Sequence, residues 1–246
     1  MQLLDSQLLL PDVTLERYDK RLVIKSEVPL RTLSSAVYRG GRQDDIRSIL
    51  NLTVHKGYRC SDPAEDLKRE IRELGLPDQS IGLMTAVDVK NGVVAFESVG
   101  SEPDSPLLVV AVVTAGSGNA WRAGTWPSYL GQEQTSALNP FPYPLGTINM
   151  VVLIDGTMTD AAMVNAIATV TEVKTAIFYE RGIRCPGSGQ MATGTTTDAV
   201  VIATTGRGQS MEYGGPGTVV GTLIAQAVTK ALNEALDIYD RGKVIG

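Results

Sequence analysis

Apolar and polar residues alternate over short stretches of the first hundred residues, a pattern typical of half-buried strands bounded by turns. Further along, several stretches are apolar at almost every position, which indicates strands buried on both faces. An Asn91-Gly92 pair between two of the predicted strands is a strong signal for a β-hairpin. The predicted strands cover residues 21–25, 33–38, 81–89, 93–97, 107–116, 147–154 and 199–204.

Apolar residues at helical spacing predict three helices. In the first, an aspartate in the cap position is followed by Pro63, which is favoured at the first helical position. The second is apolar on almost every face, and the third carries an apolar stripe along one side. The predicted helices run from Asp62 to Gly75, from Thr159 to about Arg181, and from about Thr218 to Gly242.

The predicted strands cluster in hairpins before residue 155, whereas helices alternate with strands after it. This order predicts an α+β fold in a single domain, residues 1–246, in which a mixed β-sheet is layered with long α-helices. Residues 123–144 are rich in Pro, Gly, Gln and Ser and are expected to form a long loop. The segments MTAVD (84–88) and VTAGS (113–117) both end a strand with Thr-Ala, so they either lie side by side or resemble each other by chance.

The composition is ordinary for a soluble globular protein, with 43% hydrophobic and 20% charged residues. A net charge of -5 without a Lys or Arg run argues against a nucleic-acid partner. The two cysteines lack CxxC spacing, so no disulfide framework or zinc site is expected, and a cytoplasmic location is the simplest interpretation. We expect neither a signal peptide nor a membrane span of about 18 apolar residues. The sequence requires no cofactor and is compatible with a homo-oligomer.

The segment GTTTD, residues 194–198, places three threonines and an aspartate after a glycine and directly before a predicted strand. Gly194 lets a ligand approach the main chain, and the hydroxyls of Thr195 and Thr197 can donate and accept hydrogen bonds. Asp198 can accept a proton or orient one of these hydroxyls. The alternative is a turn in which the same side chains satisfy local backbone donors.

Two further glycine-rich segments have a similar character. TAGSGNA begins at Thr114 and includes Asn119, directly after a buried strand. EYGGPGT includes Tyr213 and Gly214 and leads into the last helix, whose unpaired N–H groups could hold a ligand oxygen. The alternative is an ordinary helix start with Thr218 as its cap. Neither segment is a phosphate-binding P-loop.

Glu172 lies on the second helix at helical spacing from Asn165 and Thr169. Because an unpaired carboxylate is costly to bury, we expect it either to pair with a base such as Lys174 or to face a wet cavity. His55 is the only histidine, and no nucleophile signature surrounds it. One histidine without an HExxH motif also argues against a catalytic metal site.

Several of these segments together resemble the adenosylcobinamide amidohydrolase family. The resemblance runs from about Leu30 to the last helix, with the motifs in the same order as in the family. One departure is Thr196, where the family pattern often has Gly. The segments that carry the resemblance are GLMTAVDV (82–89), VTAGSGNAWRAG (113–124), GTINMVVLIDGTMTDAAMVNAIATVTEVKTAIF (146–178), ATGTTTDAVVIA (192–203) and YGGPGTVVGTLIAQAV (213–228).

The resemblance implies a corrinoid-salvage hydrolase that cleaves the amide between the aminopropanol arm and the corrin ring system of adenosylcobinamide. The products would be adenosylcobyric acid and aminopropanol, for cobalamin synthesis. The alternatives are a corrinoid-binding protein without catalysis and another amidase, or a self-processing hydrolase, with a threonine nucleophile.

Amide hydrolysis requires an activated nucleophile, donors for the oxyanion and a proton for the leaving amine. Our hypothesis is that Asp198 or Glu172 activates water or a threonine hydroxyl, with Thr197 the leading hydroxyl, and that N–H groups of residues 194–196 stabilise the oxyanion. The loop at residues 123–144 would form one wall of the cleft. The predicted substrate-binding residues are Thr85, Thr114, Asn119, Asn149, Gly194, Thr195, Tyr213 and Gly214.

Overall fold

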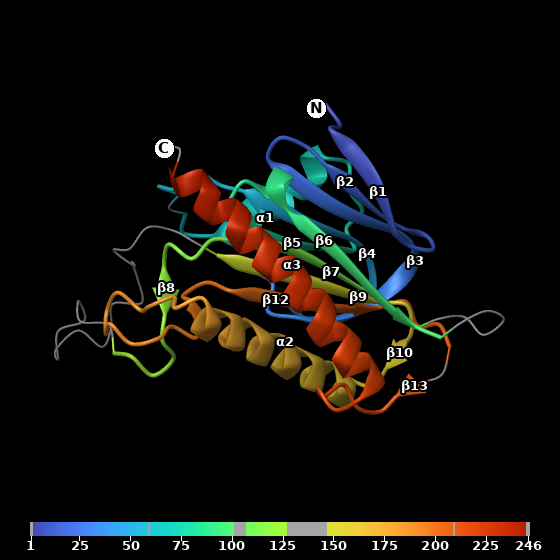
Figure 1. Ribbon diagram of the computed structural model, residues 1–246. Coiled ribbons are helices and arrows are strands. Elements are labelled where there is room, and N and C mark those ends of the chain that lie inside the picture. The colour runs from blue at the N-terminus through green and yellow to red at the C-terminus, as the bar shows by residue number, and fades with distance from the viewer. Residues whose placement is uncertain (1, 59, 101–106, 127–146, 209, 245–246) are drawn as a thin grey trace.

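The computed structural model describes residues 2–58, 60–100, 107–126, 147–208 and 210–244 (Figure 1). Within this part of the chain, nine strands form one mixed sheet in the order β1-β2-β3-β12-β9-β7-β6, and β4 pairs with both β3 and β5. The strands are β1 (Asp5–Leu10), β2 (Val13–Arg17), β3 (Arg21–Ser34), β4 (Gly41–Thr53), β5 (Ser80–Thr85), β6 (Val93–Val99), β7 (Leu107–Ala115), β9 (Ile148–Ile154) and β12 (Ala199–Thr204).

The long strand β3 makes the sheet curl. Its first half pairs with β2 and its last residues pair with β12, whereas β4 runs along its other edge and carries β5 beyond it. Apolar residues of β4 and β5 thereby share one core with residues of β7, β9 and β12. Along β9, Val151 and Leu153 face this inner core, and Met150 and Val152 face the opposite side.

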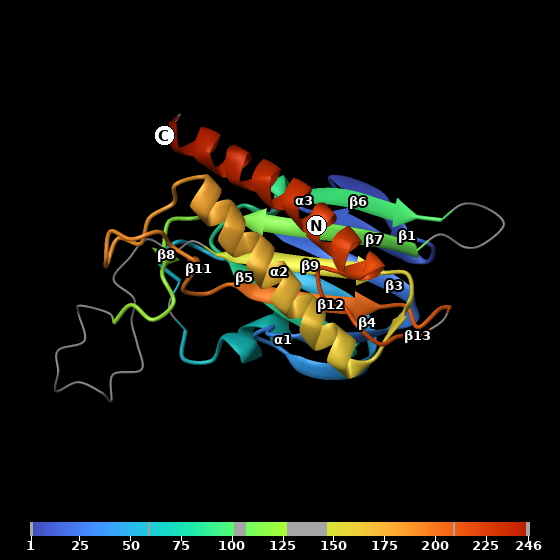
Figure 2. The ribbon, with the colours of Figure 1, turned by 60° about the horizontal axis from the view of Figure 1, so that its bottom comes forward.

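The described residues contain three α-helices, which cover the outer faces of the curled sheet. Helices α2 (Asp160–Glu180) and α3 (Val219–Val244) lie across β6, β7, β9 and β12, as Figure 2 shows, and bury a second core between helices and sheet. Helix α1 (Pro63–Glu73) packs on the other side, where Leu67 lies against Gly82 of β5. The α+β class predicted from the sequence is confirmed.

Local signals at several element ends act as predicted. The Asp62 carboxylate accepts from the Glu65 N–H at the start of α1, and the Thr159 hydroxyl accepts from the Ala162 N–H at the start of α2. Strand β12 has the predicted bounds, and β7 and β9 are almost completely buried. Short capping patterns and uniformly apolar strands therefore specify their own structure in this chain.

The predicted hairpin at Asn91-Gly92 is wrong. Residues Val89–Asn91 form a 3₁₀ turn that Asp88 caps, and Gly92 has a φ of -60, unlike the positive φ of a tight hairpin turn. Strand β6 instead pairs with β7, and β5 pairs with β4 at the other end of the sheet. Partner strands distant in sequence thus override a local turn signal.

Other boundaries also differ from the sequence prediction: the predicted strand at residues 21–25 and the start of the one at residues 33–38 belong to the single strand β3, and β6 extends to Val99. Residues 35–38 lie outside β3, and residues 86–89 lie outside β5. Gly242 lies inside α3 and does not end it. Strands β1, β2 and β4 were not predicted from the sequence.

Helix α2 is long and apolar enough, by length and composition alone, to cross a membrane, although the sequence analysis found no such window. In the structure, eight of its residues are buried, including Met163, Val170 and Phe178 within the core beneath it. The apolar character of α2 is therefore explained by its packing against the sheet and the neighbouring helix α3.

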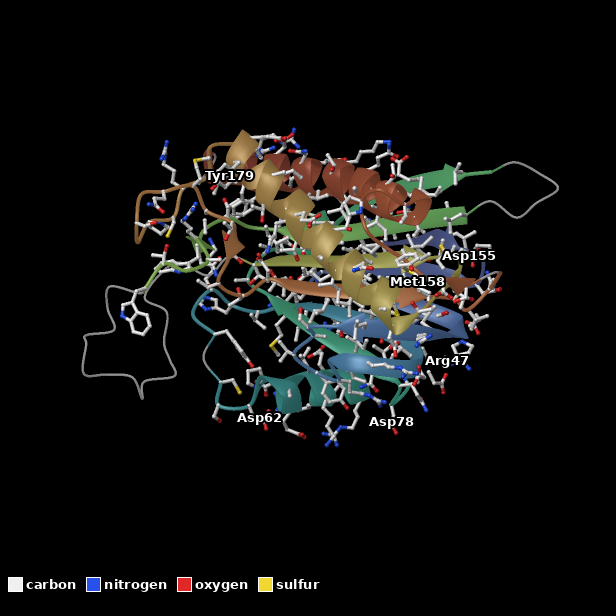
Figure 3. The ribbon with its side chains drawn as sticks, turned by 90° about the horizontal axis from the view of Figure 1, so that it is seen from below. Arg47, Asp62, Asp78, Asp155, Met158 and Tyr179 are labelled. Atoms are coloured by element: carbon white, nitrogen blue, oxygen red, sulfur yellow. The ribbon has the colours of Figure 1, made fainter. Side chains whose placement is uncertain are left out.

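Two small strand pairs mark opposite ends of the main sheet. Strand β8 (Ala120–Trp121) pairs with β11 (Gly194–Thr195) at one end, and β10 (Thr157–Met158) pairs with β13 (Ser210–Met211) at the other (Figure 1). Figure 3 shows the same separation along α2, with Tyr179 at one end and Met158 at the other. The first end, called here the β8–β11 end, holds most of the predicted site residues.

Candidate functional site

Chain ends of several strands converge at the β8–β11 end. The turn at residues 195–198 precedes β12, Thr147 precedes β9, and the turn at residues 116–119 follows β7. Lys174 reaches the same place from the second half of α2. Segments far apart in sequence therefore present their polar side chains together.

The Asp198 carboxylate is the centre of this arrangement. It accepts from Lys174 Nζ at 2.5 Å, from the Thr195 N–H at 2.9 Å and from the Ile148 N–H at 3.1 Å. The Thr195 hydroxyl also donates to it. The side chains of Lys174 and Asp198 are only 10% and 9% exposed. A carboxylate offers about four lone-pair positions, so this one is saturated with donors.

A buried ion pair of this kind is costly to desolvate and is weak evidence for stability. The pair lies beside a hydroxyl group, however, and is therefore placed to take part in chemistry at that hydroxyl. Thr195 Oγ1 donates its proton to Asp198, and the ammonium of Lys174 holds the carboxylate from the other side. The three groups are called here the Thr195–Asp198–Lys174 triad.

Gly194 is the backbone position that allows this packing. A methyl group at this position would lie 2.6 Å from both Asp198 Oδ2 and Lys174 Nζ, so any side chain would displace the ion pair. A close approach to the Gly194 main chain thus occurs as predicted, but the approaching groups are Asp198 and Lys174 of the protein itself and not a ligand.

A cavity of about 440 Å³ opens beside the triad. Its wall includes Thr195 and Lys174 of the triad, together with Trp121, Thr171 and Thr175. A volume in the range of roughly 300–1,000 Å³, apolar walls and a few polar groups are typical of small-molecule sites.

The remaining hydroxyls of the segment form a second cluster next to the triad. Thr147 and Thr197 hydroxyls lie 2.8 Å apart, and Asn119 Nδ2 donates to Thr196 at 2.6 Å and to Thr197 at 3.3 Å. The buried Asn119 Oδ1 has no hydrogen-bond partner within the described residues. Thr196 is not among the residues with positive φ, so this turn folds without the glycine of the family pattern.

Thr85, Thr114 and Asn149 lie inside the molecule, not on a cavity wall. Asn51 Nδ2 donates to the Thr114 hydroxyl at 3.0 Å, and Asn149 Nδ2 donates to Asn51 Oδ1 at 2.9 Å. The Thr85 hydroxyl accepts from the Val87 N–H. All three predicted binding residues are at most 2% exposed, and the hydrogen bonds of Thr114 and Asn149 to Asn51 connect β4, β7 and β9.

The structure does not bring Glu172 into the site. Its side chain is exposed, contrary to the expected burial, and Lys174 pairs with Asp198 instead. Two helical positions correspond to about 200° of rotation, so Glu172 points away when Lys174 points inward. Our inference from the apolar surroundings failed because the buried face of α2 runs through Val170, Lys174 and Ile177.

Tyr213 and Gly214 lie at the opposite end of the sheet. Tyr213 is 71% exposed, and the Gly214 carbonyl accepts from Thr169 on α2. Thr218 caps α3 by accepting from the Gly221 N–H, as the alternative interpretation predicted. His55 is exposed, and its Nδ1 accepts from the Gly57 N–H.

Lys174 was missed as a site residue and considered only as a counter-ion for Glu172. A signal was present, because a lysine in an otherwise apolar stretch needs a buried anion or an exit to solvent. Which carboxylate would meet it could not be read from the sequence, since Asp198 is 24 residues away. Most of the predicted loop at residues 123–144 lies outside the described residues.

Within the described residues, no group of three or more His, Cys, Asp or Glu side chains is placed to hold a metal ion. The free Cys185 is buried and Cys60 is exposed. The chemistry that the described site offers is therefore that of hydroxyl, carboxylate, ammonium and amide groups.

The fold and the site together define an α+β protein with a hydroxyl–carboxylate–ammonium triad beside a cavity at one end of a curled sheet. A model of the family described as adenosylcobinamide amidohydrolase matches residues 9–243. The chain belongs to this family, as the sequence resemblance predicted.

Individual relatives are distant. An uncharacterized protein of Methanocaldococcus jannaschii is 33% identical over 183 residues, which cover 71% of this chain and 69% of that protein. An adenosylcobinamide amidohydrolase of Methanosarcina mazei is 26% identical over 229 residues, covering 89% of this chain and 96% of that protein. A solved structure of a Pyrococcus horikoshii protein covers 90% of this chain and 78% of its own, with a TM-score of 0.43 and 12% identity.

Proposed function

We propose that this protein hydrolyses the amide that joins the aminopropanol arm to the corrin ring system of adenosylcobinamide. Membership of the family supports the substrate class. The observation that carries the chemistry is the Thr195–Asp198–Lys174 triad beside a cavity of about 440 Å³. A hydroxyl next to a base that a third group orients is the usual arrangement for nucleophilic attack on a carbonyl.

In the proposed mechanism, Thr195 is the nucleophile, in place of the Thr197 hydroxyl favoured from the sequence. Its Oγ1 already donates to Asp198, whereas Thr197 lies in the neighbouring hydroxyl cluster. As the bond between Oγ1 and the amide carbon forms, the hydroxyl proton passes to Asp198. Collapse of the tetrahedral intermediate breaks the carbon–nitrogen bond, and Asp198 returns the proton to the leaving amine.

Water then hydrolyses the ester left on Thr195. Asp198 takes one proton from the water, the hydroxide adds to the carbonyl carbon, and Thr195 recovers its proton as adenosylcobyric acid leaves. Because the Thr195 N–H is bound to Asp198, it does not serve as the oxyanion donor that we expected. The ammonium of Lys174 has three N–H donors and supplies this charge stabilisation from the cavity wall.

The direct experiment incubates purified protein with adenosylcobinamide and measures free aminopropanol by mass spectrometry. We expect release that persists after chelator treatment and that Asp198→Asn abolishes. Tight corrinoid binding without aminopropanol release would identify a binding protein instead. Loss of activity with the chelator would assign the reaction to a metal hydrolase and contradict the triad.

Intact-mass analysis after rapid quenching distinguishes the nucleophile. An adduct with the mass of the corrinoid acyl group is expected on the wild-type chain and is absent from Thr195→Ala. Thr197→Ala, the matched hydroxyl variant, should retain the adduct. The reverse result would assign the attack to Thr197.

A further inference from the structure

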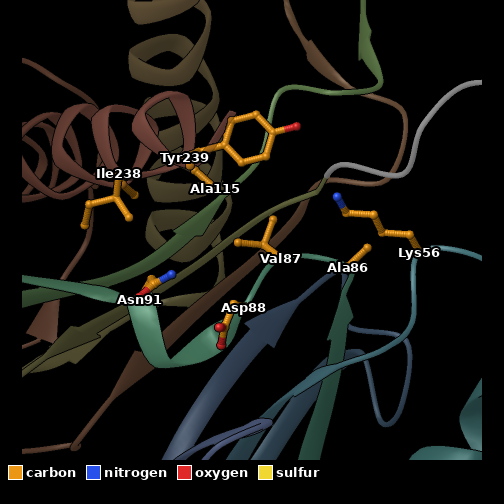
Figure 4. Close-up of a pocket in the computed structure, with 10 residues that line it drawn as sticks. Lys56, Ala86, Val87, Asp88, Asn91, Ala115, Ile238 and Tyr239 are labelled. Carbon is orange, nitrogen blue, oxygen red and sulfur yellow. The ribbon is translucent and has the colours of Figure 1, made fainter. Parts of the chain in front are cut away.

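A second cavity lies at the same end of the sheet and takes no part in the triad. It has a volume of about 520 Å³, and Figure 4 shows that the residues around it come from separate parts of the chain, with Lys56 following β4. Ala86, Val87 and Asp88 follow β5, Ala115 ends β7, and Tyr239 comes from α3. The Thr-Ala segments that end β5 and β7 therefore do lie side by side, across this cavity.

The two cavities are close enough to receive one ligand. Ala115 pairs with Ile148 of β9, whose N–H donates to Asp198. Two strand spacings correspond to about 10 Å, so the second cavity begins about that far from the triad. The turn at residues 116–119 lies between the two sites, because Asn119 contacts the hydroxyl cluster next to the triad and the Gly118 backbone hydrogen-bonds Tyr239 of the second cavity.

The turn at residues 116–119 packs tightly against residues of the second cavity. A methyl group at Gly116 would lie 2.6 Å from Val87 and 3.1 Å from the Tyr239 ring. The turn therefore packs directly on the two residues that shape the second cavity, and a ligand joining the two places must pass over the turn, not through it.

The lining favours a flat, neutral and polar-edged group. Val87, Ala115 and Ile238 supply apolar walls, and Tyr239 supplies an aromatic surface on which a base can stack. The Asn91 side-chain amide can donate and accept at once, which is the pattern that an adenine edge matches.

Charge argues against a nucleotide phosphate. Asp88 lies in the wall, and Lys90, outside the lining, is paired with it at 2.8 Å. Lys56 is the one cation among the lining residues, so the lining carries no cluster of basic side chains. Burial raises the pKa of Tyr239 and Asp240 raises it further, so the hydroxyl stays protonated and uncharged at neutral pH.

We propose that this cavity binds the adenosyl group of the substrate, a neutral purine nucleoside, while the aminopropanol amide lies at the triad. This inference rests on the proposed function. A corrinoid carries its adenosyl group on one face of the ring and the amide on a side chain at its edge. One molecule can therefore occupy both cavities by lying across the turn at residues 116–119.

The test compares two substrates that differ only in the upper ligand, adenosylcobinamide and cyanocobinamide. Tyr239→Ala is expected to raise the KM for adenosylcobinamide by about 5-fold to 100-fold, as loss of one base–aromatic stack would. The KM for cyanocobinamide should not change. Tyr213→Ala, which removes an exposed tyrosine at the opposite end, is the matched control and should change neither value.

A second measurement does not depend on turnover or on the stability of a variant. Equilibrium dialysis of wild-type protein with adenosine should detect binding, which Asn91→Leu weakens and Tyr213→Ala does not. Binding of adenosine without aminopropanol release would reject the proposed reaction and keep the nucleoside site. An equal change in KM for both corrinoids in Tyr239→Ala, or no adenosine binding, would overturn the nucleoside site.

Discussion

Two polar segments of similar sequence lie at opposite ends of the central sheet and have different structures. Residues 194–198 and residues 212–218 are both polar, contain glycine and lie just before a predicted strand or helix. At the β8–β11 end the segment surrounds an ion pair that is about nine-tenths buried. At the other end the segment caps a helix, and its Tyr213 side chain is exposed.

The difference lies in what the rest of the chain brings to each turn. Asp198 meets Lys174, a cation on a buried helix face that is mostly apolar. Near the opposite end, Arg31 meets Asp160 where both side chains are partly exposed, at 29% and 48%. Water screens the Arg31–Asp160 pair, so this pair contributes little to stability. In the buried Lys174–Asp198 pair, loss of either partner would leave an uncompensated charge.

The largest expected effect follows from breaking the buried pair. Lys174→Met leaves the Asp198 carboxylate buried without its cation and should lower the free energy of unfolding by about 3–5 kcal/mol. Arg31→Met at the exposed pair should cost at most about 1 kcal/mol. Urea unfolding followed by circular dichroism measures both. Equal losses for the two variants would contradict the contrast between the ends.

The double variant Lys174→Met, Asp198→Leu sharpens this result. Removal of both charges should recover most of the lost stability, because no unpaired charge stays buried. Aminopropanol release should stay undetectable, since the base and the ammonium are both gone. Recovery of activity in this variant would reject the catalytic role of the pair.

Loss of the triad hydroxyl should affect the rate far more than the stability. Thr195→Ala is expected to lower kcat/KM by about 100-fold or more. Thr197→Ala should lower it by about 10-fold or less, the value of one ordinary hydrogen bond. Steady-state assays with adenosylcobinamide compare the two, and a larger loss in Thr197→Ala would exchange their roles.

Glycine substitutions compare the two turns directly. Gly194→Ala places a methyl group 2.6 Å from both members of the ion pair, and such overpacking should cost about 1–3 kcal/mol together with most of the activity. Gly215→Ala places its methyl group in open space and should change stability by less than about 0.5 kcal/mol. Thermal unfolding and the aminopropanol assay test both variants. A neutral Gly194→Ala would mean that the turn is looser than described.

The smallest effect is expected at the helix cap of the opposite end. Thr218→Ala removes the acceptor for the Gly221 N–H and should lower the free energy of unfolding by about 1 kcal/mol. Its kcat/KM should match that of the wild type. A clear loss of turnover in Thr218→Ala at full folding would place this end in the active site and contradict the division described above.

Sequence reasoning reached part of the site. Thr195, Thr197, Asp198 and Asn119 do meet in space, because each belongs to a polar turn at the end of a buried strand. It failed for Glu172, because a helix that is apolar on most sides does not reveal which face is buried. Thr85, Thr114 and Asn149 were found as polar residues in buried strands, but their burial places them inside the protein, where each hydrogen-bonds a protein group.

By itself, the sequence determined the elements whose signals are local: the caps at Asp62 and Thr159, the uniformly apolar strands β7, β9 and β12, and the α+β class. Family membership could also be inferred from ordered motifs. Only the tertiary structure decided that β5 pairs with β4 and not with β6, and that Lys174 forms an ion pair with Asp198. It also decided which of the two polar turns surrounds a buried ion pair. The reason is that these outcomes depend on pairings between distant segments, whose energies come from burial and charge contacts that no single window of sequence contains.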